Sequence, residues 1–142
     1  MIYVGSDHAG YPLKTALVEY LKENEIEFTD LGCNGETVDY PDIARLVCGK
    51  VLESADNRGV LVCGTGIGIS MAANRIKGIR AALCGDYYSA KFTRRHNDAN
   101  VICFGRHVIG AGLAAELLDV FLNTDFDGGK HTPRINKIEG EI

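Results

Sequence analysis

Short runs of apolar and β-branched residues alternate along the chain with longer segments whose apolar residues recur every three or four positions. The short runs predict strands at 2–5, 27–31, 59–63, 79–84 and 101–104. The longer segments predict helices at 12–24, 43–54, 67–75, 87–95 and 110–122, followed by a polar tail from position 123 with a turn at 128–129. Five alternating strand–helix units are typical of an α/β fold with a five-stranded parallel sheet covered on both faces. No linker or repeat interrupts the pattern, so we expect residues 1–142 to form a single domain.

Unusual polar residues follow the predicted strands. In open parallel sheets, ligands bind at the carboxyl ends of the strands, so these residues are candidates for a site. They are residues 6–8 after the first strand, 39–41 in the connection after the second, 63–65 after the third, Asp86 after the fourth and 105–107 after the fifth. Two histidines fall elsewhere: His96 closes a predicted helix, and His131 lies in the polar tail.

The segment VLVCGTGIGIS, residues 60–70, ends an apolar strand in a cysteine and continues with glycines at alternate positions. A dinucleotide fingerprint needs glycine at position 69, where Ile69 stands. A P-loop needs lysine and then serine or threonine after the last glycine, and the chain has Ile69-Ser70. A cysteine phosphatase needs arginine six positions after Cys63, which is again Ile69. These three kinds of site are therefore disfavoured.

An anion-binding loop without a cofactor remains. The backbone amides of Gly64–Gly68 are able to approach a ligand closely, and a helix starting at Ile67 adds its positive N-terminal end. The same field favours the thiolate form of Cys63. The loop is then able to stabilise an oxyanion while the thiol moves a proton. The alternative is that Cys63 is a small buried hydrophobe ending a core strand, as free cysteines often are.

Composition narrows the class of protein. Hydrophobic residues make up 46% and charged residues 24% of the 142 residues, which is typical of a globular protein. The net charge of −4 argues against nucleic-acid binding, whereas basic clusters at 75–107 and 130–137 favour a small anionic ligand. No segment has the length of a membrane span or the pattern of a signal peptide, so we expect a cytoplasmic protein with no membrane partner. Five cysteines without a CxxC pair predict reduced thiols and no structural metal site.

Six motifs, in order along nearly the whole chain, closely resemble those of type B ribose-5-phosphate isomerase. They are GSDHAGY (5–11), DYPD (39–42), CGTGIGISMAANR (63–75), GIRAAL (78–83), RRHNDANV (94–101) and GGKHTPRI (128–135). The resemblance implies a three-layer αβα Rossmann-like domain. It implies a homodimer whose two sites each draw residues from both subunits, and leaves open whether dimers pair into tetramers. The implied activity interconverts D-ribose 5-phosphate and D-ribulose 5-phosphate through an enediol(ate), without metal or cofactor, in the non-oxidative pentose phosphate pathway.

The resemblance also implies a role for individual residues. Cys63 corresponds to the base that carries the proton between C2 and C1. The loop residues Gly64, Thr65, Gly66, Ile67 and Gly68, with the Thr65 hydroxyl, correspond to the hole that holds the enediolate oxygen. His96 corresponds to the acid/base that opens the furanose ring, helped by Asp7. The remaining contacts are Asn97 and Tyr40 to the sugar and His8 and Arg134 to the phosphate.

Two residues depart from the pattern of close relatives. Lys130 stands where they carry arginine, which keeps the charge and loses the bidentate hydrogen bonding to phosphate. His107, preceded by Arg106, stands where they usually carry arginine, so either residue is a candidate phosphate contact. Simpler interpretations also stay open. In one, His96 interacts favourably with the dipole at the C-terminal end of its helix. In the other, Tyr40 lies in an extended turn because proline restricts the residue before it.

Two other functions compete with the pentose phosphate isomerase. One is isomerisation of a hexose 6-phosphate, such as allose or galactose 6-phosphate. Galactose-6-phosphate relatives generally lack the His-Asn pair present here as His96-Asn97, so the pair favours the pentose. The other is a non-catalytic module that binds a nucleotide or phosphate. Activity on a sugar phosphate in the presence of a metal chelator would exclude this second alternative.

Overall fold

The computed structural model describes residues 1–140, and its centre is a sheet in which every neighbouring pair of strands is parallel. The strand order is β2-β1-β3-β5-β4. The strands are β1 (Ile2–Ser6), β2 (Phe28–Asp30), β3 (Arg58–Cys63), β4 (Ala81–Leu83) and β5 (Val101–Gly105). The predicted five-stranded parallel sheet is confirmed.

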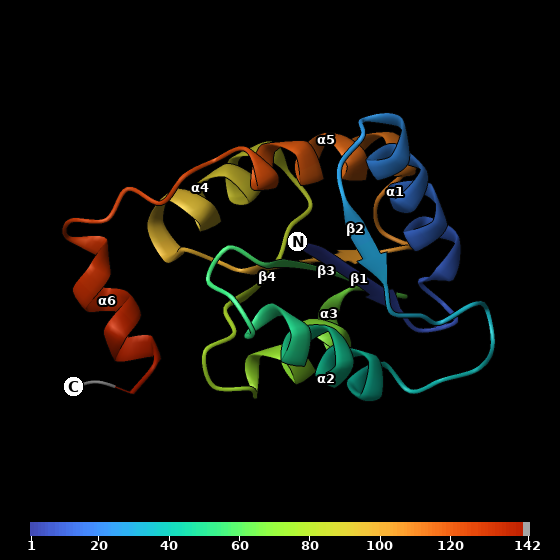
Figure 1. Cartoon of the computed structure of the whole chain (residues 1–142), viewed down its shortest axis with the longest axis horizontal. Helices are drawn as coiled ribbons and strands as arrows, with labels where there is room; N and C mark the ends of the chain where they lie inside the picture. The colour runs from blue at the N-terminus through green and yellow to red at the C-terminus, as the bar shows by residue number, and fades with distance from the viewer. Residues whose placement is uncertain (141–142) are drawn as a thin grey trace.

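Helices cover both faces of this sheet and complete the three layers of a Rossmann-like fold (Figure 1). The helices are α1 (Tyr11–Glu23), α4 (Tyr87–Asn97) and α5 (Ala111–Leu122) on one face, and α2 (Tyr40–Val51) and α3 (Ile67–Asn74) on the other. Along β3, Val60 and Val62 pack with the first group, while Leu61 and Cys63 pack with the second. All four are buried, as in other parallel strands covered on both faces.

The centre of the sheet holds a topological switch point. β1 and β3 are neighbours, although the chain forms β2 between them, so α1 and α2 leave on opposite faces. Ser6 at the end of β1 pairs with Val62, the residue before Cys63. The glycine loop after Cys63 therefore lies where open α/β sheets bind their ligands.

The end of the chain differs from the expected polar tail, because residues His131–Ile138 form a further helix, α6. It buries only His131 and Ile135, which is too weak an apolar pattern to predict a helix from the sequence. His131 is consequently the first residue of a helix and largely buried, rather than part of an exposed tail. In Figure 1, α6 stands at the left end of the molecule, beyond the end of α4.

The connection before α2 also differs from the expectation. Tyr40 is the first residue of α2 and does not lie in an extended turn, since Pro41 occupies the first helical turn, where its missing N–H is not needed. The periodic apolar pattern starts only at Ile43, which is why the sequence placed the helix start three residues late. Within residues 1–140, no helix is both long and apolar enough to span a membrane.

Candidate active site

Cys63 ends β3 with its sulfur inside the turn that the glycine loop makes. The backbone N–H of Gly66 donates to Sγ of Cys63 at 3.1 Å, and the N–H of Ile67 donates to Oγ1 of Thr65 at 3.2 Å. Gly66 precedes α3 directly, so the positive end of that helix also faces the sulfur. A donated hydrogen bond of this kind is stronger to a thiolate than to a thiol, because charge on the acceptor strengthens it.

The glycines of this loop are required by their surroundings. Gly66 has φ 77°, and a Cβ there would lie 2.5 Å from Cδ1 of Leu83 and 2.8 Å from the carbonyl carbon of Phe104. A Cβ on Gly68 would lie 2.7 Å from Cζ of Tyr40, so the tyrosine ring covers that part of the loop. The loop is thus packed tightly against the end of β5 on one side and Tyr40 on the other.

Asp7 and His8 follow the end of β1, beside the glycine loop. Asp7 is 6% exposed, and its Oδ1 accepts a hydrogen bond from the N–H of Gly10 at 2.9 Å. Its own N–H donates to the carbonyl oxygen of Val62, one residue before Cys63. His8 is exposed, with Nδ1 3.2 Å from the carbonyl oxygen of Val38.

The turn after β5 is joined to the same loop. The N–H of Arg106 donates to the carbonyl oxygen of Cys63, and the N–H of His107 donates to that of Gly64, both at 2.9 Å. Both side chains are exposed at this edge. The structure thus brings together at the carboxyl edge the residues that we name the cysteine half-site: Asp7, His8, Tyr40, Cys63, the loop Gly64, Thr65, Gly66, Ile67 and Gly68, Arg106 and His107.

The other predicted site residues lie at the opposite edge of the sheet. His96 and Asn97 end α4, the helix that leads into the start of β5. The carbonyl oxygen of Asn97 accepts from Nε of Arg80, the residue directly before β4. Lys130 precedes α6, and Arg134 lies within it. We name these four residues, His96, Asn97, Lys130 and Arg134, the histidine half-site.

The sheet separates the two half-sites. β3 has six residues, and at a rise of about 3.3 Å per residue the strand spans about 20 Å. One small sugar phosphate is too short to contact Cys63 and His96 of the same chain. The resemblance implies sites that draw residues from both subunits, and the structure shows that a single chain keeps the two groups of residues apart.

His131 lies beside the histidine half-site, although the sequence patterns did not single it out as a site residue. Its ring stacks on that of His96 at a centroid distance of 4.2 Å and an interplanar angle of 15°. Burial, followed by the nearby charges of His96, Lys130 and Arg134, lowers the pKa of His131. The sequence did offer a signal for His131. It lies in the GGKHTPRI motif, four residues before Ile135, and this spacing puts the two buried residues on one face of a helix.

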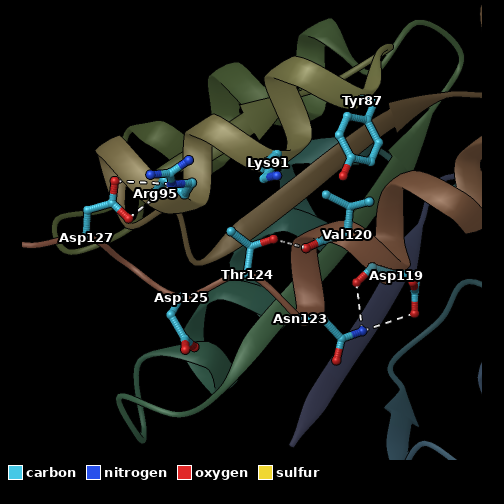
Figure 2. Close-up of a pocket in the computed structure, with 9 residues that line it drawn as sticks. All are labelled: Tyr87, Lys91, Arg95, Asp119, Val120, Asn123, Thr124, Asp125 and Asp127. Atoms are coloured by element: carbon cyan, nitrogen blue, oxygen red, sulfur yellow. Dashed lines mark hydrogen bonds and ion pairs between the residues drawn. The ribbon is translucent and has the colours of Figure 1, made fainter.

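Asp127 lies close to the two stacked rings. Its carboxylate binds Nε of Arg95 at 3.1 Å, which lowers the pKa of Asp127, and Figure 2 shows this pair at one end of the cleft beside α4. Ligand atoms of His96, Asp127 and His131 all lie within 4.8 Å of one another. The parallel rings and the neighbouring Lys130 and Arg134 disfavour a divalent cation here and favour an anion.

Comparison with known proteins identifies the family. The family model described as Ribose/Galactose Isomerase matches residues 2–138. The chain belongs to the ribose/galactose isomerase family. It is 47% identical over 139 residues to ribose-5-P isomerase B of Listeria innocua, covering 97% of this chain and 94% of that protein. It is 40% identical over 139 residues to D-erythrulose-4-phosphate isomerase of Pectobacterium atrosepticum, covering 96% of this chain and 91% of that one.

Solved structures in this family have the same fold. A ribose 5-phosphate isomerase of Thermotoga maritima superposes with a TM-score of 0.94 at 46% identity, covering 98% of this chain and 97% of that one. Ribose-5-phosphate isomerase B of Mycoplasma genitalium, with bound ribulose-5-phosphate, gives a TM-score of 0.92 at 41% identity, covering 98% and 93%. The chain is therefore a sugar phosphate isomerase.

Three of the five cysteines lie in surroundings that disfavour ionisation of the thiol. All five are free and buried. Burial raises the pKa of Cys48 to about 12, and burial with the nearby Asp86 raises that of Cys84 to about 12, so both remain protonated near neutral pH. Burial also raises the pKa of Cys103. Cys48, Cys84 and Cys103 are thus suited to packing and not to acid–base chemistry.

Proposed function

We propose that this isomerase interconverts D-ribose 5-phosphate and D-ribulose 5-phosphate in the non-oxidative pentose phosphate pathway. The observation that carries the proposal is the sulfur of Cys63 under the Gly66 amide, at the N-terminus of a helix and at the switch point of the sheet. An acidified C–H beside a carbonyl needs a base together with donors for the developing oxyanion. Several relatives are named for this reaction, and the Mycoplasma genitalium structure has ribulose-5-phosphate bound.

The isomerisation follows from the cysteine half-site. The Cys63 thiolate takes the proton from C2 of the open-chain aldose, and the electron pair of that bond moves towards the C1 carbonyl to form the enediolate. The amides of Gly64–Gly68 and the Thr65 hydroxyl stabilise the negative oxygen, and one such donor typically contributes about 3 kcal/mol. The thiol then returns its proton to C1, while the proton of the O2 hydroxyl passes to O1, which leaves the ketose.

The separation of the half-sites supports a homodimer with two shared sites. In this arrangement, the histidine half-site of each subunit faces the cysteine half-site of its partner. A two-fold axis makes both composite sites identical. Apolar side chains are exposed near the cysteine half-site, where a second subunit would cover them: Ile67 is 47%, Met71 66% and Val108 72% exposed. Association of dimers into tetramers is compatible with this arrangement.

The composite site assigns the other roles. His96 is the acid/base that opens the furanose ring, with Asp7 of the facing subunit assisting. Asn97 and Tyr40 contact the sugar hydroxyls. The phosphate is held by His8 with Arg106 or His107 from one subunit and by Lys130 and Arg134 from the other, which together supply the positive charge that a dianion needs.

The direct test is a coupled assay of ribose 5-phosphate conversion in the presence of a metal chelator. Wild type is expected to be active, and Cys63→Ala to lose at least about a thousandfold in kcat, in line with removal of a catalytic base. Cys84→Ala is the matched control, because it removes a buried thiol that does not ionise near neutral pH. Near-normal turnover by Cys63→Ala contradicts the assignment.

The same assay compares substrates of different length. The relative from Pectobacterium atrosepticum is named for a four-carbon sugar phosphate, so erythrulose 4-phosphate belongs in the comparison together with allose and galactose 6-phosphates. We expect the highest kcat/KM with ribose 5-phosphate. A higher value with a four- or six-carbon substrate would transfer the assignment to that substrate and keep the chemistry.

A further inference from the structure

Helix α6 is held at its N-terminal end by α4. The N–H of Asp127 donates to the carbonyl oxygen of Arg95 at 3.0 Å, and its carboxylate pairs with the Arg95 guanidinium (Figure 2). Four residues later, the ring of His131 stacks on that of His96. These contacts fix where α6 begins, but leave its direction to the contacts at its other end.

The C-terminal end of α6 is held by Glu139. One carboxylate oxygen accepts a hydrogen bond from Nη1 of Arg80 at 2.7 Å, and the other accepts from the N–H of Gly78 at 3.0 Å. The side chains of Arg80 and Glu139 are only 18% and 20% exposed. A short, charge-assisted pair that is partly shielded from water holds its geometry better than an exposed pair.

The same guanidinium also binds the end of α4. Nε of Arg80 donates to the carbonyl oxygen of Asn97 at 2.9 Å, and Nη2 donates to that of Asp98 at 2.9 Å. The backbone of Arg80 is itself fixed, because its N–H donates to Oδ1 of Asn100. One side chain therefore joins the helix that carries His96 and Asn97 to the helix that carries Arg134.

We propose that Arg80 and Glu139 are positioning residues for substrate binding: they set the direction of α6 and so hold Arg134 at a fixed place relative to His96 and Asn97, while the contacts at the other end of the helix place Lys130. This inference rests on the proposed function, in which Lys130 and Arg134 bind the phosphate of the substrate while His96 acts on its ring.

The need for this pair follows from how little else holds α6. The helix has eight residues and is about 12 Å long, and it buries only His131, in its first turn, and Ile135. Without Glu139, the His131 stack and the buried Ile135 remain to oppose a change in the direction of the helix, and any such change moves Arg134. Lysine at position 80 would keep the charge but not the flat fork that reaches a carboxylate and two carbonyl groups at once.

The test compares Glu139→Gln and Arg80→Lys with wild type. Each variant is expected to raise KM for ribose 5-phosphate and Ki for inorganic phosphate in parallel by about tenfold, which corresponds to about 1.4 kcal/mol of binding, with kcat reduced less than KM is raised. Amide hydrogen exchange across residues 131–138 is expected to accelerate in both. The control is Glu53→Gln, which removes the carboxylate of an exposed Lys50–Glu53 pair of 3.1 Å and is expected to change none of these.

The outcomes separate this inference from the proposed function. Inactive wild type would overturn the proposed function itself. Active wild type, with KM and phosphate Ki unchanged in Glu139→Gln and only thermal stability reduced, would overturn the positioning role and leave the reaction intact. If Arg80→Lys does not fold, Glu139→Gln carries the test alone, since Arg80 keeps its bonds to Asn97 and Asp98 in that variant.

Discussion

The sharpest prediction concerns mixing two inactive variants, Cys63→Ala and His96→Ala. In one chain, Cys63 and His96 lie at opposite edges of a sheet that is about 20 Å across along β3. In the proposed dimer, a mixed pair of subunits carries one site with both substitutions and one site with neither. The intact site combines Cys63 from the His96→Ala chain with His96 from the Cys63→Ala chain.

The size of the recovery follows from the two-fold arrangement. Random reassortment of equal amounts makes half of the dimers mixed, and each mixed dimer has one intact site of two. Activity is therefore expected to reach about a quarter of wild type, against almost none for either variant alone. The assay is ribose 5-phosphate conversion, measured after mild dissociation and reassociation of the mixture.

A control pair from a single half-site makes the result specific. Cys63→Ala mixed with Asp7→Ala leaves one substitution in each of the two sites of a mixed dimer, so no comparable recovery is expected. Recovery that appears equally in both mixtures would show that complementation does not depend on shared sites. No recovery with His96→Ala, in mixtures proven to contain mixed dimers, would refute the composite site.

The remaining predictions concern the glycine loop and His131. Gly66→Ala is expected to lose about 1–3 kcal/mol of unfolding free energy and most of the activity, because φ is 77° and the added Cβ meets Leu83 and the Phe104 backbone. Denaturant unfolding measures the change in unfolding free energy. The control is Gly49→Ala, where the added Cβ has open space. A loss no larger than in Gly49→Ala would contradict the tight packing. Burial lowers the pKa of His131 below its usual value of 6.5. Between the two pKa values the unfolded chain binds more protons than the folded chain. The contribution of the buried neutral His131 to stability is therefore present above pH 6.5 and is lost as the pH falls through the lowered pKa. His131→Phe keeps the stack and is expected to flatten this part of the pH–stability curve; an unchanged slope would exclude His131 as its cause.

The sequence predicted the sheet well because its central strands, β3 and β5, are buried on both faces. Segments such as 59–63 are almost continuously apolar, and their order with the helices leaves few arrangements of the chain. The prediction was weakest where burial is slight. Only two residues of α6 are buried, so the apolar periodicity did not predict this helix. Tyr40 lies before the apolar repeat of α2, so the periodicity placed the start of α2 too late.

The candidate site shows a different limit of sequence patterns. Cys63 ends a predicted strand and His96 closes a predicted helix, so the expected elements already place them at opposite edges of a parallel sheet. The structure has them at the end of β3 and in the last turn of α4. The bonds of Arg80 to Asn97 and Glu139 depend on tertiary placement, and no local spacing predicts them.

The two half-sites are built with different rigidity, which matches the different steps proposed for them. The loop at Cys63 allows no added Cβ at Gly66, and the N–H of Gly66 donates to the sulfur, so the arrangement proposed for proton transfer is already present in a single chain. The helix that carries Arg134 depends on a few polar contacts at its two ends. Proton transfer tolerates little displacement, whereas a phosphate dianion attracts positive charge over a longer range. Weakening the α6 contacts is therefore expected to affect binding first, and disturbing the glycine loop to affect turnover first.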